Sequence, residues 1–338
     1  MRAVTLTLHP AVDRILEIDR LLPGGLGDAR IKLTVPAGKG VNTARTLSRL
    51  WKPASEIVAV LWVGRDRADW FGEWLTENNG INTACIIRET YTRYSSTFLE
   101  ESGRETHIKE SMEAPDRAEE KQLLKYWSET LLPGDVVAVC GSAPPGTTDK
   151  TAAQVFRIAK KKKAHAIIAD PNGLMMKAAC MAGLDGVKGN ASEIGAVLGL
   201  KGPLNIRRKE HRRALRFATE KRNGPRAILV TLGAAGAVFS DGSAIYFAAP
   251  PADAGKLAKK LKVKQELFSR ASHSATGCGD AATAGWMWSI RAGFSSEDTV
   301  RAAVAFGTAK YYSVDPGFVD PELLLALGEE IEIKILPS

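Results

Sequence analysis

The sequence predicts an α/β protein, a three-layer α/β/α sandwich with a mostly parallel central sheet, helices on both faces and a small β-sheet lid. Apolar, strand-like runs alternate with helical segments through most of the 338 residues, which is the pattern of parallel strands joined by crossover helices. Two alternating, turn-rich stretches, near 14–35 and 83–99, fall outside this pattern. We expect them to pair into a small sheet that covers a binding site.

The composition is that of an ordinary soluble protein, with 45% hydrophobic and 25% charged residues. The formal net charge of +8 fits an anionic substrate, a nucleic acid or a merely basic surface. None of the four cysteines belongs to a C-x-x-C pair, so zinc and redox motifs are not supported. We find no signal-peptide pattern and no apolar run of membrane-spanning length. We therefore expect a cytoplasmic protein with reduced thiols and no membrane partner.

The first strand is expected at 4–8, where apolar residues alternate with polar ones. It leads to Asp13, and an acid just past a strand is a common ligand position in α/β folds. The alternative is a turn residue after Pro10. In the stretch that follows, Arg30 and Lys32 are two residues apart and so face the same side of a strand. They point either toward an anion or into solvent.

A turn at Gly38-Lys39-Gly40 opens the next helix. Its small residues allow a sugar to approach the backbone, and Asn42 can both donate hydrogen bonds to hydroxyls and accept them. The turn is not a Walker A loop, because the G-x-x-x-x-G-K-[ST] spacing is missing. A buried strand at 58–63 and a helix at 71–79 follow.

The second turn-rich stretch contains Arg93, which either clamps a phosphate through two parallel hydrogen bonds or lies on an exposed strand face. A strand at 135–140 then ends in a rigid Gly/Pro loop at 141–146. The next helix ends in four lysines at 160–163, where positive charge favours the helix dipole. We interpret that run as a solvated helix end rather than a nucleic-acid patch.

A strand at 166–169 is followed by a helix that starts near 191. Asn190 and Glu193 are three residues apart and so share a face at that helix start. They either orient metal-bound water near a triphosphate or form a capping box.

A basic helix at 205–222 precedes a buried strand at 227–232. Gly233 and Gly236 come directly after this strand, where they either permit close approach of a phosphorylated ligand or make a β-turn. A lysine-rich insert at 253–272 follows. Small-residue helices are expected from 281 and at 300–310, and a last short helix at 323–327.

The chain is organised around the turn at 274–280, where Gly277 and Gly279 flank Cys278 and Asp280 opens a helix. A Gly-rich turn at a helix start leaves N–H groups without intrahelical partners. The helix dipole adds partial positive charge, so the turn suits a phosphoryl group. Asp280 beside it indicates a general base for phosphoryl transfer to an alcohol. The alternative is that Asp280 only caps the helix.

Together these segments resemble the PfkB branch of the ribokinase-like carbohydrate kinases, and within it the 1-phosphofructokinase and tagatose-6-phosphate kinase group. The resemblance covers 4–312 and rests on seven segments that occur in the family's order and spacing. They are Thr5-Leu6-Thr7-Leu8-His9-Pro10-Ala11-Val12-Asp13, Gly38-Lys39-Gly40-Val41-Asn42-Thr43-Ala44-Arg45, Thr92-Arg93, Gly141-Ser142-Ala143-Pro144-Pro145-Gly146, Asn190-x-x-Glu193, Thr231-Leu232-Gly233-x-x-Gly236 and Gly277-Cys278-Gly279-Asp280.

The resemblance implies a ribokinase-like fold as a single domain over 1–338, with a β-lid formed by about 11–36 and 90–110. It implies ATP- and Mg²⁺-dependent phosphorylation of a sugar phosphate hydroxyl, with fructose 1-phosphate converted to fructose 1,6-bisphosphate. The alternatives are tagatose 6-phosphate, fructose 6-phosphate, or another sugar or nucleoside as substrate. A further alternative is a non-catalytic protein of this fold that binds a ligand or nucleic acid. We expect no nucleic acid, because the basic stretches lack interleaved aromatic residues.

The resemblance also implies the role of each site residue. Asp280 is the base, and the backbone N–H groups of Gly277, Cys278 and Gly279 hold the γ-phosphoryl group. The sugar phosphate is bound by Asp13, Gly38, Lys39, Asn42, Arg93 and Arg30. The nucleotide is bound by Lys188, Asn190, Thr231, Gly233 and Gly236, and Glu193 reaches Mg²⁺ through water. The lid strands form a homodimer interface.

Five residues depart from the family pattern. His9 stands where the family has Asn, Cys278 replaces Ala, Ser274-Ala275 replaces D-T or S-T, and Ser95 replaces Asn. These departures leave the identity of the sugar open. Since a helix N-terminus favours a thiolate, our hypothesis is that Cys278 has a lowered pKa and is sensitive to oxidation.

Overall fold

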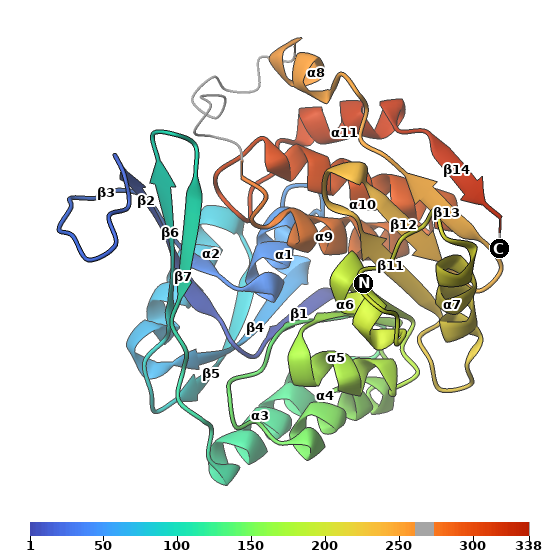
Figure 1. The fold of residues 1–338 in the computed structure, drawn as a ribbon. Coiled ribbons are helices and arrows are strands. Elements are labelled where there is room, and N and C mark those ends of the chain that lie inside the picture. Colours follow the sequence, from blue (N-terminus) through green and yellow to red (C-terminus); the bar gives the residue numbers. More distant parts are fainter. Residues whose placement is uncertain (261–273, 338) are drawn as a thin grey trace.

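The computed structural model describes residues 1–260 and 274–337. Most of the lysine-rich insert predicted at 253–272 therefore lies outside the described residues, and only its first part is seen, in helix α8 (Ala254–Lys260). Within the described ranges the strands form one ten-stranded sheet and one four-stranded sheet, which stand apart in Figure 1.

The large sheet has the strand order β14-β13-β12-β11-β10-β9-β8-β1-β4-β5. The strands from β11 to β5 are parallel, while β12, β13 and β14 extend the sheet by antiparallel pairing. Their bounds are β1 Ala3–Thr7, β4 Ile57–Gly64, β5 Asn82–Arg88, β8 Val136–Gly141, β9 Ala166–Pro171, β10 Gly186–Asn190, β11 Ala227–Thr231, β12 Ala237–Ser240, β13 Ile245–Ala248 and β14 Ile333–Leu336.

Helices cover both faces of this sheet, because successive residues of its strands point to opposite sides. In β4, Ile57, Ala59 and Leu61 pack into one hydrophobic cluster, while Val58 and Val60 pack into the other. The first cluster contains α1 (Lys39–Leu47), α2 (Ala68–Asn79), α8, α9 (Cys278–Ala292), α10 (Ser296–Tyr311) and α11 (Pro321–Glu330). The second contains α3 (Arg117–Thr130), α4 (Asp149–Lys161), α5 (Gly173–Cys180), α6 (Ala191–Val197) and α7 (Lys209–Glu220). The predicted three-layer fold class is confirmed.

The small sheet, at the left of Figure 1, has the strand order β3-β2-β6-β7. Its strands are β2 (Ala11–Ile18), β3 (Arg30–Ala37), β6 (Tyr94–Glu100) and β7 (Glu105–Lys109).

Three sequence-based expectations about these elements need correction. Asp13 lies inside β2 rather than in a turn or just past a strand. The stretch 83–99 is divided, because β5 pairs in parallel with β4 at the edge of the large sheet and only β6 joins the small one. Most residues of both β5 and β6 are partly buried, so the two strands resemble each other in sequence and the pattern did not separate them. The basic helix expected at 205–222 is shorter and spans α7 only.

The order of the strands reverses in the middle of the large sheet. From β1 the chain builds outward through β4 and β5 on one side, and through β8, β9, β10 and β11 on the other. Ligands of such sheets bind at this switch point, beyond the carboxyl ends of the strands. Helix α1 is held close there, since a Cβ atom on Gly40 would lie 2.4 Å from Oγ1 of Thr7. No helix within the described ranges is long and apolar enough to cross a membrane.

Candidate active site

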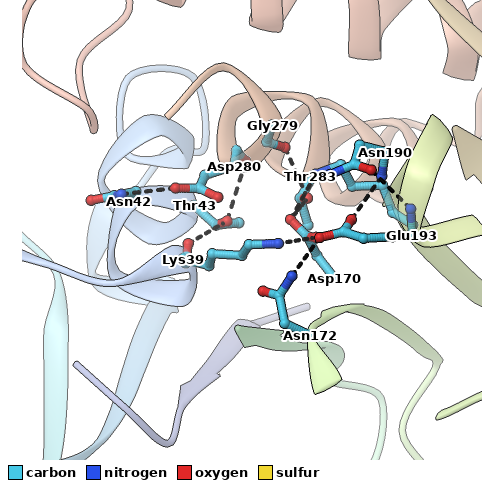
Figure 2. A network of polar contacts seen from close by, with 11 residues as sticks. Lys39, Asn42, Thr43, Asp170, Asn172, Asn190, Glu193, Gly279, Asp280 and Thr283 are labelled. Atoms are coloured by element: carbon cyan, nitrogen blue, oxygen red, sulfur yellow. Dashed lines mark hydrogen bonds and ion pairs between the residues drawn. The ribbon is translucent and has the colours of Figure 1, made fainter. Parts of the chain in front are cut away.

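Asp170 is the centre of the polar network at the switch point (Figure 2). It lies near the carboxyl end of β9 and is completely buried. Nζ of Lys39 donates to Oδ1 of Asp170 at 2.9 Å, and Nζ of Lys188 donates to Oδ2 at 2.8 Å. Oγ1 of Thr283 also donates to Oδ2, at 2.9 Å. Burial opposes ionisation of Asp170, but the two ammonium groups outweigh it and lower its pKa.

Asp280 lies in the first turn of α9 and is 7% exposed. Nδ2 of Asn42 donates to Oδ2 of Asp280 at 2.8 Å, and Oγ1 of Thr43 donates to its main-chain oxygen at 3.2 Å (Figure 2). Burial and the charge of Asp170 raise the pKa of Asp280 to about 6. An aspartate whose pKa is near the working pH can accept a proton and release it again.

These residues form a four-charge cluster of Lys39, Lys188, Asp170 and Asp280. Burial lowers the pKa of Lys39, but the two carboxylates outweigh this effect and raise it overall. Both ammonium groups are therefore held in place by carboxylates of the protein itself, beside the start of α9.

The turn before α9 has the geometry expected of an anion site. Gly277 has a φ angle of +86°, and a Cβ atom there would lie 2.3 Å from the main-chain oxygen of Pro316. A Cβ atom on Gly279 would lie 2.8 Å from Nζ of Lys188, so this ammonium group borders the turn. The N–H of Cys278 donates to the oxygen of Ala275 at 3.3 Å. The other N–H groups at the helix start have no intrahelical acceptors and are available to an anion, and the N–H of Cys278 would be shared between the oxygen of Ala275 and the anion.

The hypothesis of an activated thiol at Cys278 is wrong. Burial is the largest influence on this group, and it raises the pKa despite the nearby charge of Lys310. The Sγ atom donates to the main-chain oxygen of Ser274 at 3.6 Å. Desolvation of the thiolate outweighs the effect of the helix N-terminus.

Asn190 and Glu193 form the capping box that the sequence left open as an alternative. Oδ1 of Asn190 accepts from the N–H groups of Ser192 and Glu193, and Oε2 of Glu193 accepts from the N–H of Asn190 at 2.8 Å. The other carboxylate oxygen of Glu193 accepts from Nδ2 of Asn172. The cap therefore fixes the orientation of the Glu193 carboxylate.

Thr231 pairs in register with Asn190, so the ends of β10 and β11 lie side by side. Gly233 and Gly236 belong to a tight 3-10 turn, η3 (Gly233–Ala235) with its cap, between β11 and β12. A Cβ atom on Gly236 would lie 2.0 Å from the oxygen of Ala248. The fold itself thus requires this glycine, whether or not a nucleotide binds beside it.

Asp13, Arg93 and His9 lie where the small sheet meets the large one. Burial raises the pKa of Asp13 to about 6, although Ser95 hydrogen-bonds to it. Nη2 of Arg93 donates to the main-chain oxygen of His9 at 3.0 Å, and its buried Nε has no partner among the described residues. Burial, Arg93 and Arg88 lower the pKa of His9 to about 3, so this imidazole is neutral. Its Nδ1 lies 3.2 Å from Oγ of Ser142.

Arg30 is not brought to this cluster within one chain. It lies on the small sheet opposite Glu17, with which it forms an ion pair, and its side chain is 81% exposed. Gly38, by contrast, caps α1 directly before Lys39 and has a φ angle of +118°.

Sequence reasoning missed Asp170, Asn172, Thr43 and Thr283. A signal for Asp170 was present, since an acid directly follows the apolar run of β9. The same rule singled out Asp13. Thr43 and Thr283 gave no such signal, because small polar residues on helices are common and only the fold brings them to the aspartates.

A family model described as pfkB family carbohydrate kinase matches residues 30–318. The chain belongs to the pfkB family of carbohydrate kinases. A 1-phosphofructokinase of Rhodobacter capsulatus is 27% identical to this pfkB kinase over 345 residues, covering 100% of the chain and 99% of that protein. A 1-phosphofructokinase of Bacillus subtilis is 26% identical over 335 residues, covering 98% and 99%.

Among solved structures, the tetrameric inhibited form of phosphofructokinase-2 from Escherichia coli has a TM-score of 0.81 at 23% identity, covering 97% of this chain and 98% of that one. At this identity the likeness shows the fold. The family resemblance and the prediction of an ATP-dependent carbohydrate kinase are confirmed. The alternative of a non-catalytic protein finds no support, because the relatives named here are kinases.

Proposed function

We propose that this pfkB kinase transfers the γ-phosphoryl group of ATP to the free primary hydroxyl of fructose 1-phosphate and forms fructose 1,6-bisphosphate. One observation carries the proposal. The buried carboxylate of Asp280, held by Asn42, lies in the first turn of α9, directly beside an anion-binding turn and Lys188. The names of the full-length relatives support the sugar.

In the proposed reaction, Asp280 accepts the proton of the sugar hydroxyl as its oxygen attacks the γ-phosphorus. The bond from that phosphorus to the bridging oxygen breaks, and ADP leaves. Phosphoryl transfer depends mainly on positioning and charge neutralisation. The N–H groups of Gly277, Cys278 and Gly279, together with Lys188, supply the neutralising groups. Asp13, Gly38, Lys39 and Asn42 hold the sugar, and Arg93 holds its phosphate.

We further propose that Asn190, Thr231, Gly233 and Gly236 line the nucleotide, and that Glu193 meets Mg²⁺ through water. Within the described ranges no group of three His, Cys, Asp or Glu residues could hold a metal ion directly. This donor set fits Mg²⁺, which usually keeps several waters and binds substrate phosphates rather than an all-protein cage. Both oxygens of Glu193 are fixed by hydrogen bonds, so it would present an oriented acceptor to that water. When bound, the metal would neutralise phosphate charge.

The proposal is tested by measuring ADP release from ATP and Mg²⁺ with fructose 1-phosphate, fructose 6-phosphate, tagatose 6-phosphate and free sugars. We expect the highest kcat/KM with fructose 1-phosphate. A higher value with either 6-phosphate would replace the proposed substrate and keep the reaction class. If the protein binds ATP but phosphorylates none of them, the sugar-phosphate proposal is wrong and nucleosides are the next substrates to test.

Replacing Arg93 by Ala should raise KM for the sugar phosphate by about 10- to 100-fold, since charged hydrogen bonds contribute roughly 1.5–3 kcal/mol. KM for ATP should change little. The matched control is Arg2→Ala, which removes a half-buried arginine paired with Asp135 below the amino ends of the strands. Equal increases in both KM values for the Arg93 variant would show that Arg93 does not bind the sugar's phosphate.

Activity should fall tenfold per pH unit below about pH 6, because only the ionised carboxylate of Asp280 can accept a proton. Burial and Asp170 raise the pKa of Asp280 to about 6, so the acid limb lies above the range of an ordinary aspartate. The measurement is kcat/KM between pH 4.5 and 8.5. The pKa of Asp13 lies in the same range. If Asp280 is the base, kcat/KM of Asp13→Asn should still fall below about pH 6. A kcat/KM that stays constant down to about pH 4 would contradict this assignment.

We also propose that 1–338 is a single kinase domain, that it acts in the cytoplasm, and that two copies pair through the small sheet. The pairing is supported by exposed apolar side chains on and beside that sheet. Leu26 is 97% exposed, and Ile31 and Ile108 are also exposed. Light scattering of the wild type and of Leu26→Asp would test it, and a monomeric wild type would disprove it.

A further inference from the structure

Lys310 is a completely buried lysine near the end of α10, and the reaction proposed above gives it no role. Its Nζ donates to the main-chain oxygen of Ser313 at 2.8 Å and to that of Ser274 at 3.2 Å. Among the ion pairs of the described residues, none includes Lys310. An ammonium group held by main-chain carbonyls rather than by a carboxylate needs an explanation, because a buried charge without a paired charge is costly.

The two carbonyls belong to the two segments that shape the anion-binding turn. Ser274 begins the turn itself, and its N–H donates to the oxygen of Tyr311 at 3.2 Å. Ser313 begins the loop after α10, which continues to Pro316, whose main-chain oxygen packs against Gly277. Lys310 therefore connects the segment that begins at Ser274 with the loop that begins at Ser313. Removing its ammonium group would deprive both carbonyl oxygens of the hydrogen bond that they accept from Nζ.

Main-chain carbonyl oxygens are also the ligands that replace the hydration shell of a bound K⁺ ion. An ammonium group has one positive charge and offers its donors to the same oxygens. We propose that Lys310 is a built-in monovalent cation, whose ammonium group occupies the place where free K⁺ or NH₄⁺ would otherwise hold the carbonyls of Ser274 and Ser313. It is a positioning residue that fixes the turn at 277–279 for phosphoryl transfer, and in this respect the inference rests on the proposed function.

The charges around Lys310 fit this role. Burial lowers its pKa, while Cys278, Asp315, Asp280 and Glu105 act against that effect. Asp315 is already paired with Arg45, and Asp280 with Asn42. The ammonium group thus places a positive charge next to the anion-binding turn without forming an ion pair.

The experiment compares the wild type with Lys310→Ala and Lys310→Met in tetramethylammonium, Na⁺, K⁺ and NH₄⁺ salts of equal concentration. The wild type should keep the same kcat within about twofold in all four, because a tethered cation leaves no site for a free one. Lys310→Ala should lose about 100-fold in tetramethylammonium, as expected for a displaced reacting group. In K⁺ or NH₄⁺ the kcat of Lys310→Ala should be at least about tenfold higher than in tetramethylammonium. Lys310→Met fills the space without charge and should not recover.

A matched control is Lys160→Ala. Nζ of Lys160 also donates to two main-chain oxygens, those of Ala182 and Gly183, but it is exposed and belongs to α4. This variant should show neither loss nor cation response. The proposal is overturned if the wild type needs K⁺ for activity, if Lys310→Ala keeps full activity in tetramethylammonium, or if folded Lys310→Ala does not respond to K⁺ or NH₄⁺.

Melting temperature without substrates separates this inference from the proposed function. A cation that binds only the folded state stabilises it, so K⁺ should raise the melting temperature of Lys310→Ala but not that of the wild type or of Lys160→Ala. This comparison decides the inference even if no tested sugar is phosphorylated. If Lys310→Ala is unfolded in every salt, the kcat of the wild type in the four salts decides the inference. Equal kcat in all four salts supports the proposal, and a higher kcat in K⁺ overturns it.

Discussion

Replacing Asp280 by Asn is expected to lower kcat by about 10²- to 10⁴-fold, the usual contribution of a positioned general base. Nucleotide binding should survive. The amide has the shape of the carboxylate and can still accept the hydrogen bond from Nδ2 of Asn42. Because burial raises the pKa of the native carboxyl group, removal of its charge should not destabilise the fold. Single-turnover kinetics and ADP titration would measure the two quantities.

The control for this prediction is Asp320→Asn. Asp320 caps α11 by accepting from the N–H of Leu323 at 3.0 Å, and asparagine is an equally good N-cap residue. The same chemical change at a different helix start should therefore leave kcat unaltered. An Asp280→Asn enzyme with full turnover would remove Asp280 as the base. Joint loss of turnover and ADP binding would instead assign it a structural role.

Replacing Asp170 by Asn should damage both stability and activity. The change leaves the ammonium groups of Lys39 and Lys188 without their carboxylate, and the side chain of Lys188 is only 4% exposed. Breaking a buried ion pair by removing one partner costs about 3–5 kcal/mol. We expect the melting temperature to fall by roughly 6–10 °C. We also expect kcat/KM to fall by at least about tenfold, because both lysines lose their alignment.

Asp135→Asn separates the two effects. Asp135 is also buried and pairs with Arg2 at 2.8 Å, but it precedes β8 at the amino edge of the sheet and its arginine is 29% exposed. This variant should lose some stability and keep its kcat. Adding Lys188→Met to Asp170→Asn should recover part of the lost stability, since it removes one of the two unpaired ammonium groups. It should not recover activity, since the ammonium group of Lys188 is then absent. Full activity of Asp170→Asn would contradict the role given to the four-charge cluster.

The sequence was sufficient for features that depend on neighbouring residues. The glycine turn with Asp280, the Asn190–Glu193 pair and the alternating β and α segments each lie within a short window, and the structure has all of them. Features that depend on tertiary packing were not visible. Lys39 and Asp170 are separated by 131 positions, and no local pattern reveals that β9 ends opposite the start of α1. The direction of the Cys278 pKa shift likewise depends on burial, which the motif does not encode.

The four-charge cluster has a consequence for the end of the reaction cycle. With Asp280 ionised, two ammonium groups face two carboxylates and the cluster is electrically neutral. If Asp280 takes the proton of the sugar hydroxyl, the cluster acquires a net charge of +1 at the moment when the bisphosphate product forms beside it. The product is then held more strongly than the substrate was, until Asp280 gives up its proton to solvent. Product release and proton release are thereby coupled, and turnover limited by release should become faster as pH rises above the pKa of Asp280.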